Sequence, residues 1–224
     1  MKKLPVLKTK RMYLTPSTEQ EISKLLEATE DPALKQTYSF MLAACRNNPE
    51  QQGWFVPWRM MLKDKPSESI GMIGFGGPPK DGCVSIGCGV NSEHEDNRYA
   101  TEAARKLIGW AFNDKSVNII KAETAPENEA SVRLLKRLKF EKFGPGGKNI
   151  SFVLKRPRTE WPTIMIAGGM AVGMLVGMLT GQMLIFMAAG MLVGLIAGRV
   201  FDNKEKDRVD NCLAGLGKNE NDTE

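Results

Sequence analysis

The stretch EDNRYATEAARKLIGWAF, residues Glu95 to Phe112, carries the strongest local signal for the fold. From Tyr99 onward its apolar residues recur every three or four positions, which predicts an amphipathic helix over about 99–113. The start of such a helix exposes unpaired backbone N–H groups and favours anions. Two carboxylates, Glu95 and Asp96, directly precede this start, so the sequence places acidic side chains beside an anion-binding helix end.

Apolar runs on both sides of this helix predict a sheet. Three runs joined by polar turns lie before it and predict an antiparallel meander, whereas strands alternate with helices after it. Residues 17–47 predict two short helices broken near Asp31-Pro32, with Ser17 and Gln20 at capping-box spacing. The sequence therefore predicts a mixed α/β (α+β) sheet with flanking helices. The three runs and the later elements span residues 53–64, 69–77, 82–91, 117–125, 128–138 and 149–157.

The C-terminal third contains a long segment without charge. No charged residue occurs from 161 to 198, a run of 38 residues. A straight helix of that length would measure about 57 Å, whereas a bilayer core is about 30 Å thick. Thr180, Gly181 and Gln182 interrupt the apolar pattern, so two helices of about 16 to 19 residues in a hairpin fit a membrane better. Basic residues flank both ends, which predicts that both flanks are cytoplasmic.

The predicted organisation has three parts. Residues 1–158 form the sheet domain, residues 159–201 form a two-pass α-helical transmembrane hairpin, and residues 202–224 form a polar, disordered cytoplasmic tail. Glycines recur every fourth residue along each predicted span. Such rows of small residues let helix backbones approach closely, as in a glycine zipper, within the hairpin or between copies in a homo-oligomer. These glycines are Gly169, Gly173, Gly177 and Gly181 in the first span and Gly190, Gly194 and Gly198 in the second.

Four ordered blocks resemble the GNAT superfamily of acyl-CoA-dependent N-acyltransferases, in particular its ribosomal-protein-acetylating branch. The blocks are LKTKRMYLTP, IGMIGFGGPPKDGCVSIGCGV, YATEAARKLIGWAF and AETAPENEASVRLLKRLKF, and the resemblance covers about Leu7 to Pro157. It implies that acetyl-CoA binds as co-substrate in a V-shaped gap between strands that end near Val90 and Thr124. It also implies that the diphosphate lies on the turn before the Tyr99 helix. The residues implied to contact the cofactor are Val90, Arg98, Tyr99, Ala100, Thr101 and Asn128.

This chain departs from the family pattern at that turn. The family turn is Arg/Gln-x-x-Gly-x-Gly/Ala, and the matching positions here are Glu95, Arg98 and Ala100. A carboxylate about 4 Å from a phosphate costs on the order of 1 to 4 kcal/mol. Asp96 adds a second carboxylate, although an acid at a first helical turn also serves as a cap. A further departure is Lys139, which occupies a glycine position after the second core helix, where a left-handed conformation is usual.

The resemblance also implies two catalytic residues. Ser131 stands where this branch has a hydroxyl suited to protonating the leaving thiolate, and the alternative is an ordinary first-turn serine. Glu123 is the candidate base nearest in sequence, although strand alternation equally allows it to face solvent. Asn128 is implied to contact the pantetheine arm, and the alternative is a plain helix N-cap.

The sequence supports two hypotheses of different classes. The first is a membrane-anchored N-acyltransferase that transfers an acetyl group from acetyl-CoA to a primary amine, either a protein N-terminus or a small amine. The second is a catalytically degenerate GNAT-like domain that serves as a membrane-tethered binding or assembly module. Residues 1–160 carry 26 Lys and Arg against 19 Asp and Glu, an excess that fits attraction to the headgroups of a lipid bilayer. No interleaving of basic and aromatic residues favours nucleic acid. A single histidine and four cysteines without CxxC spacing predict no metal site.

Overall fold

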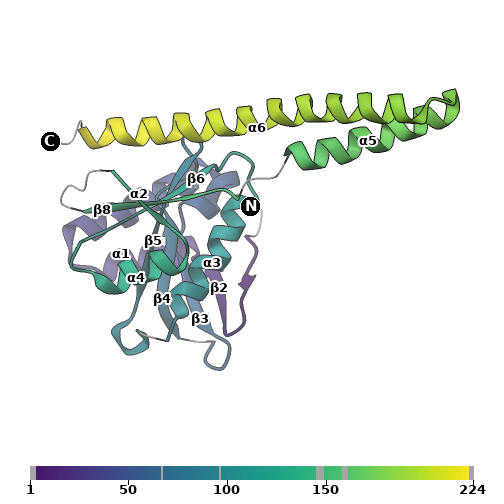
Figure 1. The fold of residues 1–224 in the computed structure, drawn as a ribbon. Coiled ribbons are helices and arrows are strands. Elements are labelled where there is room, and N and C mark those ends of the chain that lie inside the picture. The colour runs from purple at the N-terminus through teal and green to yellow at the C-terminus, as the bar shows by residue number, and fades with distance from the viewer. Residues whose placement is uncertain (1–3, 67, 96, 145–148, 158–160, 222–224) are drawn as a thin grey trace. The chain divides into compact units, whose positions relative to one another are not determined.

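One mixed sheet organises the first part of the chain in the computed structural model, which describes residues 4–66, 68–95, 97–144, 149–157 and 161–221 (Figure 1). Within these residues the sheet has eight strands in the order β1-β2-β3-β4-β5-β6-β8-β7. Neighbouring strands are antiparallel except β5 and β6, which are parallel. The strands are β1 (Leu7–Lys8), β2 (Met12–Pro16), β3 (Trp58–Leu62), β4 (Ser69–Phe75), β5 (Cys83–Val90), β6 (Ile119–Thr124), β7 (Glu141–Phe143) and β8 (Ile150–Lys155).

The predicted antiparallel meander is confirmed. Strands β3, β4 and β5 are consecutive neighbours, with Met60 opposite Gly71 and Gly74 opposite Gly87. The predicted strands over 117–125 and 149–157 are present as β6 and β8. Strand β7 was not predicted, because three residues are too few to show an alternating pattern.

Four helices accompany the sheet. They are α1 (Glu19–Ala28), α2 (Pro32–Asn47), α3 (Tyr99–Phe112) and α4 (Glu129–Arg137), with short 3-10 turns at Pro49–Trp54 and Ser92–His94. The break near Asp31-Pro32 is confirmed: Asp31 accepts a hydrogen bond from the amide of Ala33, and proline occupies the first helical position. The capping box of α1 lies one residue later than predicted, between Thr18 and Glu21.

The main core lies between the sheet and helices α3 and α4. Helix α3 contributes Ala103, Leu107 and Ala111, each fully buried and four residues apart, which explains why this stretch is helical. A smaller apolar cluster lies under α1 and α2 and includes Ile22 and Cys45. The predicted fold class, a mixed α+β sheet with flanking helices, is therefore confirmed.

The last residue of the first unit holds the C-terminal end of α3. The Arg156 guanidinium donates to the carbonyl oxygens of Val117 (2.8 Å), Phe112 (2.7 Å) and Asp114. A cation at this position also complements the negative end of the α3 dipole. The chain divides into two compact units directly after this residue, between Arg156 and Pro157. The predicted boundary at 158 lies outside the described residues.

The second unit consists of two apolar helices, α5 (Trp161–Thr180) and α6 (Met183–Asn221). Both are long and apolar enough to cross a membrane by length and composition: the candidate spans are 162–180 and 183–214. Gly181 lies between the helices with a φ of 74°. A side chain is strained in this left-handed conformation, so glycine suits the tight reversal.

Glycines bring the backbones of α5 and α6 into contact. A Cβ atom placed on Gly169 would overlap the carbonyl oxygen of Gly190, and one placed on Gly190 would overlap that of Gly169. Gly194 faces the backbone of Met165 in the same way, whereas the space beside Gly168 is open. Gly169, Gly190 and Gly194 therefore lie at the contact between α5 and α6.

The structure differs from the sequence prediction in the C-terminal tail. Residues 202–224 were expected to be disordered, whereas α6 extends through Asn221, and residues 222–224 lie outside the described residues. Opposite charges four residues apart favour this helix: Asp202 precedes Lys206, which precedes Asp210. The apolar helix also provides a nucleus, so the following turns add at little cost.

Candidate active site

Strands β5 and β6 part halfway along their length. They pair only between Cys83–Ser85 and Ile119–Lys121, whereas β5 continues to Val90 and β6 continues to Thr124. Beyond Lys121, β6 keeps its partner β8 while β5 keeps β4. A gap therefore opens in the middle of the sheet, where the resemblance places the acyl donor.

Backbone donors of β5 face this gap. Ser85 and Asn91 both hydrogen-bond to the β4 side, with N···O distances of 2.9 Å. Bonding to a given neighbour alternates along an antiparallel strand, so the amides of Cys88 and Val90 point the other way, toward the gap. An N–H at this position can polarise a carbonyl oxygen of a bound thioester.

Helix α3 begins at the mouth of the gap with a left-handed residue. Arg98 is the N-cap residue of α3, with φ 60° and ψ 18°, and its own side chain makes no capping hydrogen bond. The backbone conformation that glycine usually supplies is thus retained here by an arginine. Among the described residues, no side chain bonds to the first-turn amides of α3, and such amides can bind an anionic ligand.

Arg11, in the bend before strand β2, holds this turn in place. Its guanidinium donates to the carbonyl oxygen of Asn97 (3.0 Å) and lies 4.4 Å from the ring centroid of Tyr99. It also pairs with Glu102 on the first turn of α3, with an Nε···Oε2 distance of 2.8 Å. Burial alone would raise the pKa of Glu102, but hydrogen bonds from Arg11 and Thr9, together with the Arg11 charge, lower it below its usual value.

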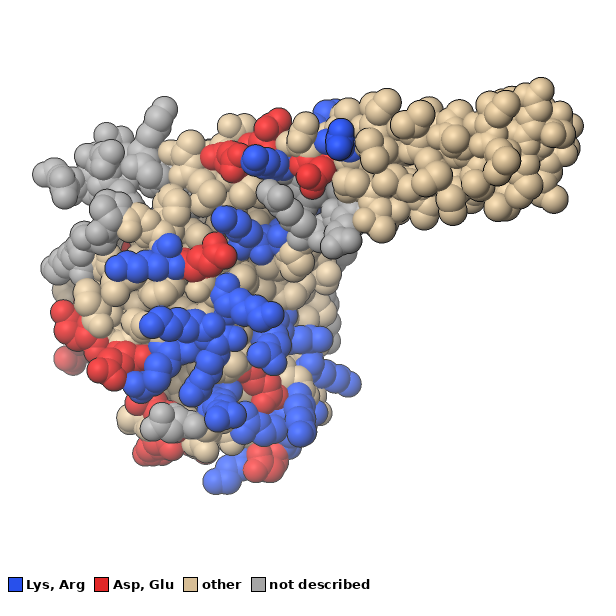
Figure 2. Space-filling model, viewed as in Figure 1, with Lys and Arg blue, Asp and Glu red and all other residues tan. Residues whose placement is uncertain are grey.

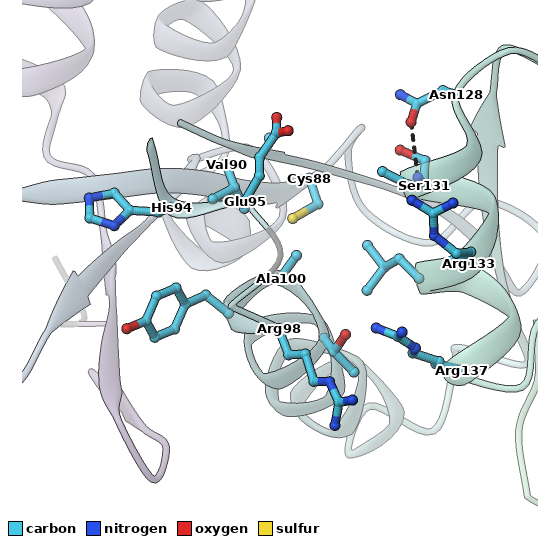
Figure 3. A pocket seen from close by; sticks show the side chains of 15 residues that line it. Cys88, Val90, His94, Glu95, Arg98, Ala100, Asn128, Ser131, Arg133 and Arg137 are labelled. Carbon is cyan, nitrogen blue, oxygen red and sulfur yellow. Dashed lines mark hydrogen bonds between the residues drawn. The ribbon is translucent and has the colours of Figure 1, made fainter. Parts of the chain in front are cut away.

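A hollow of about 260 Å³, called the donor hollow below, lies between the α3 start, β5 and α4 (Figure 3). Every residue predicted to contact the cofactor lines it, and so does Ser131. Glu95 is at the edge, and its carboxylate points away from Ala100 at the α3 start (Figure 3). Asp96 lies outside the described residues. The donor hollow is lined by Cys88, Gly89, Val90, His94, Glu95, Arg98, Tyr99, Ala100, Thr101, Asn128, Ala130, Ser131, Arg133, Leu134 and Arg137.

Asn128 and Ser131 meet at the start of α4. The Oδ1 atom of Asn128 accepts a hydrogen bond from the Ser131 amide at 2.9 Å (Figure 3). Asn128 is therefore the N-cap of α4, the structural alternative considered from the sequence. The cap uses the side-chain oxygen, so its NH₂ group can still donate to a ligand in the donor hollow.

Glu123 does not line the donor hollow. It lines a groove of about 780 Å³ formed with strands β4 and β5 and helix α2, called the acceptor groove below. Its Oε1 atom lies 2.8 Å from the Nζ atom of Lys121. A narrow cavity of about 70 Å³ in the gap is lined by both Glu123 and Ser131, so the two predicted catalytic residues approach the gap from different sides.

Sequence reasoning did not predict Cys88, Arg133 or Arg137 among the residues of the donor hollow. Arg133 and Arg137 lie four residues apart on α4, and this spacing was the signal that could have identified them. Cys88 lines the same hollow, and burial raises the pKa of its thiol to about 12. A raised pKa makes a thiol a poorer nucleophile at neutral pH, although Cys88 itself is exposed at the surface.

Comparison with known proteins agrees with this geometry. Residues 11–141 match the family model of the acetyltransferase (GNAT) domain. The chain is 37% identical over 128 residues to the N-acetyltransferase p20 of Bacillus licheniformis, covering 57% of this chain and 70% of p20. It is 37% identical over 87 residues to the N-acetyltransferase YjdG of Bacillus subtilis, covering 38% of this chain and about half (51%) of YjdG.

Solved structures share the fold at low identity. RimJ of Mycobacterium smegmatis, in complex with CoA-disulfide, is 15% identical with a TM-score of 0.53, over 69% of this chain and 90% of RimJ. The ribosomal-protein-S5-alanine acetyltransferase of Vibrio fischeri is 15% identical with a TM-score of 0.54, over 69% of this chain and 100% of that protein. Since the family model matches more than half of the chain, this protein belongs to the GNAT acetyltransferase family.

Proposed function

We propose that this protein is a membrane-anchored N-acetyltransferase that transfers the acetyl group of acetyl-CoA to a primary amine, either a protein N-terminus or a small amine. The observation that carries the proposal is that the β5–β6 gap, the left-handed turn at the start of α3 and Ser131 all open onto one hollow. GNAT enzymes use acetyl-CoA, and the donor hollow fits its anionic, thioester-bearing chain because it combines backbone donors, three arginines and a hydroxyl group.

Each group has a distinct role in the proposed reaction. When bound, acetyl-CoA supplies the thioester carbonyl carbon that the neutral amine attacks. The amide of Val90 or Cys88 stabilises the negative charge that develops on the carbonyl oxygen. Glu123, on the acceptor side, takes a proton from the amine directly or through water. The Ser131 hydroxyl donates a proton to the leaving thiolate, so a bond forms to nitrogen as the carbon–sulfur bond breaks.

The competing function is a degenerate domain that only binds or assembles partners. Glu95 supports it, because a carboxylate replaces the basic residue of the family turn. The left-handed Arg98 opposes it, because the backbone of the turn is kept despite the loss of glycine. Under this alternative the full chain in detergent micelles would bind acetyl-CoA no better than a non-nucleotide thioester.

The decisive experiment measures binding and turnover with the full chain. Calorimetric titration should show saturable binding of acetyl-CoA, and a thiol assay should detect CoA release with a peptide whose N-terminus is free. The same peptide with a blocked N-terminus, and with no lysine, is the matched control. Ser131→Ala should lower kcat more than it changes KM, since the hydroxyl acts on the leaving group. The absence of binding at millimolar acetyl-CoA would refute the proposal.

Membrane anchoring rests on the second unit. The first candidate span has 19 residues, about 28 Å of helix, which matches a bilayer core of about 30 Å. Lys155 and Arg156 precede it and Arg199 follows the apolar part of α6, so both ends are expected on the cytoplasmic side. Alkaline carbonate should leave the chain in the membrane pellet. Epitope tags at both termini should be accessible to protease only from the cytoplasmic face, and release into the supernatant would exclude an anchor.

A further inference from the structure

Two hollows of the first unit meet at Arg137. The donor hollow shares Arg98, Thr101 and Arg137 with a neighbouring hollow of about 740 Å³, called the basic hollow below. Lys and Arg side chains gather on this face over helices α3 and α4 (Figure 2). The basic hollow is lined by Thr9, Lys10, Arg11, Arg98, Thr101, Glu102, Arg105, Lys106 and Arg137.

The charge of the basic hollow is strongly one-sided. Six of its lining residues are cations, and its one carboxylate, Glu102, is paired with Arg11. Within the described part of the chain, no carboxylate forms an ion pair with Arg98, Arg105 or Arg137. Unpaired cations around a concave surface create a positive potential that favours a multiply charged anion.

The donor hollow is too small for a whole nucleotide-linked thioester. Its volume of about 260 Å³ is below the roughly 300 to 1,000 Å³ typical of sites for drug-sized ligands. The phosphate-bearing end must therefore leave the donor hollow, and the shared residues mark a continuous exit into the basic hollow. Arg137 stands at this junction.

Helix α4 supplies cations where the turn before α3 has lost one. Arg133 and Arg137 lie one helical turn apart on α4; Arg137 extends toward α3, whereas the guanidinium of Arg133 lies near Ser131 (Figure 3). Arg133 is partly engaged, since its Nη1 atom pairs with Glu129 at 2.9 Å. Arginine is well suited to phosphate because its planar fork donates two parallel hydrogen bonds.

We infer that Arg137, assisted by Arg133, binds the phosphates of the acyl donor, so that side chains of α4 replace the basic residue missing from the turn. This inference rests on the proposed function, because it specifies how the same donor is held. Of the two α4 arginines, Arg137 is the principal contact because it lines both hollows, whereas Arg133 lines only the donor hollow. Glu95 is then tolerated, because the phosphates lie against α4 rather than beside the carboxylate.

The test compares two donors and two neighbouring substitutions in the full chain. S-acetyl-pantetheine carries the thioester without any phosphate of acetyl-CoA. Arg137→Gln should weaken acetyl-CoA binding about 10- to 100-fold, which corresponds to one charged hydrogen-bonded contact, and should leave S-acetyl-pantetheine binding within about twofold. Lys136→Gln removes a charge from the next position of α4, which lines neither hollow, and should change both affinities by less than about twofold. Arg137→Lys should recover part of the loss.

The outcomes separate this inference from the proposed function. Equal weakening of both donors by Arg137→Gln would show that the residue only supports the fold, and would overturn the inference. Equal weakening of acetyl-CoA binding by Lys136→Gln and Arg137→Gln would also overturn the inference. It would show that only the total positive charge of this surface matters, and not a contact made by Arg137. In both cases acetyl-CoA binding by the wild type would still support the proposed function. If the wild type binds neither donor, the proposed function itself fails.

Discussion

Glycine is dispensable in one unit of this protein and not in the other. In the first unit, Arg98 and Lys139 occupy positions where the resemblance implies glycine, and both keep a left-handed backbone, with φ of 60° and 66°. In the second unit, Gly169 and Gly190 face each other's carbonyl oxygens without room for a Cβ atom. A strained φ costs about 1 to 3 kcal/mol and can be offset locally, whereas overlap with backbone can be relieved only by moving a helix.

The largest effect is therefore expected in the hairpin. Gly169→Ala should separate α5 from α6, because the added methyl group meets the backbone of Gly190. Spin labels carried by noncanonical residues at the exposed positions Val172 and Leu192 would report the distance by pulsed electron resonance. The distance distribution should broaden and shift outward. Gly168→Ala is the matched control, because open space surrounds that residue, and equal shifts in both variants would contradict the proposed close packing.

The next effect concerns the support of the left-handed turn. Glu102→Gln should lower the free energy of unfolding of the first unit by about 1 to 2 kcal/mol at pH 7, because it removes a charge-assisted contact with the partly exposed Arg11. Urea denaturation of the full chain in detergent, followed by tryptophan fluorescence, would measure it. An unchanged midpoint would show that the turn does not depend on this pair.

The same pair predicts a pH dependence of stability. The pKa of Glu102 is lower in the folded state, so the unfolded chain binds more protons as the pH falls. The stabilisation is present above the unfolded pKa of about 4.3 and is lost as the pH falls through the folded value. The difference in urea midpoint between wild type and Glu102→Gln should therefore shrink below about pH 4. A difference that stays constant would argue against an ionised, hydrogen-bonded Glu102.

A smaller gain is expected from restoring glycine at the turn. Arg98→Gly should raise the free energy of unfolding by about 0.5 to 1 kcal/mol, because glycine adopts φ 60° without steric cost. The gain is limited because glycine also increases the entropy of the unfolded chain. Thermal unfolding by circular dichroism would measure it, and destabilisation would show that the Arg98 side chain makes contacts that outweigh the strain.

The smallest change is expected after helix α4. Lys139→Asn should raise stability by only a few tenths of a kcal/mol, because asparagine tolerates the left-handed region better than lysine but less well than glycine. The denaturant midpoint of Lys139→Asn would be compared with that of the control Lys142→Asn, which makes the same substitution at an exposed position of β7. A loss of more than about 1 kcal/mol would indicate that the lysine itself is needed.

Regular periodicity explains which parts of the fold were predictable. The three buried residues of α3 at four-residue spacing and the alternating strands of the meander each repeat a local signal several times, so chance variation averages out. The capping box was displaced by one residue, because Ser17-Thr18 and Gln20-Glu21 offer two equivalent pairs in the sequence. The helical tail was missed because high polarity alone is equally typical of disorder and of an exposed helix.

Only some residues of the candidate site could be predicted from the sequence. Residues such as Ser131 and Thr101 could be placed because they belong to quoted blocks with a fixed register. Arg137 could not, because its role depends on how α4 crosses the start of α3, which is a tertiary property. Likewise, the position of Glu123 in the acceptor groove follows from where β5 and β6 part, and no local pattern encodes that point.

Arg156 has a mechanical consequence. It is the last residue of the first unit. Its guanidinium donates hydrogen bonds to the carbonyl of Phe112, at the end of α3, and to those of Asp114 and Val117, in the segment between α3 and β6. If the second unit is embedded in a membrane, a pulling force along the backbone would act on the three hydrogen bonds of Arg156 together. It would not first break the hydrogen bonds of β8 one after another. In the proposed membrane-anchored form, the hydrogen bonds of Arg156 would therefore bear such a force before it reached the strands that line the donor hollow.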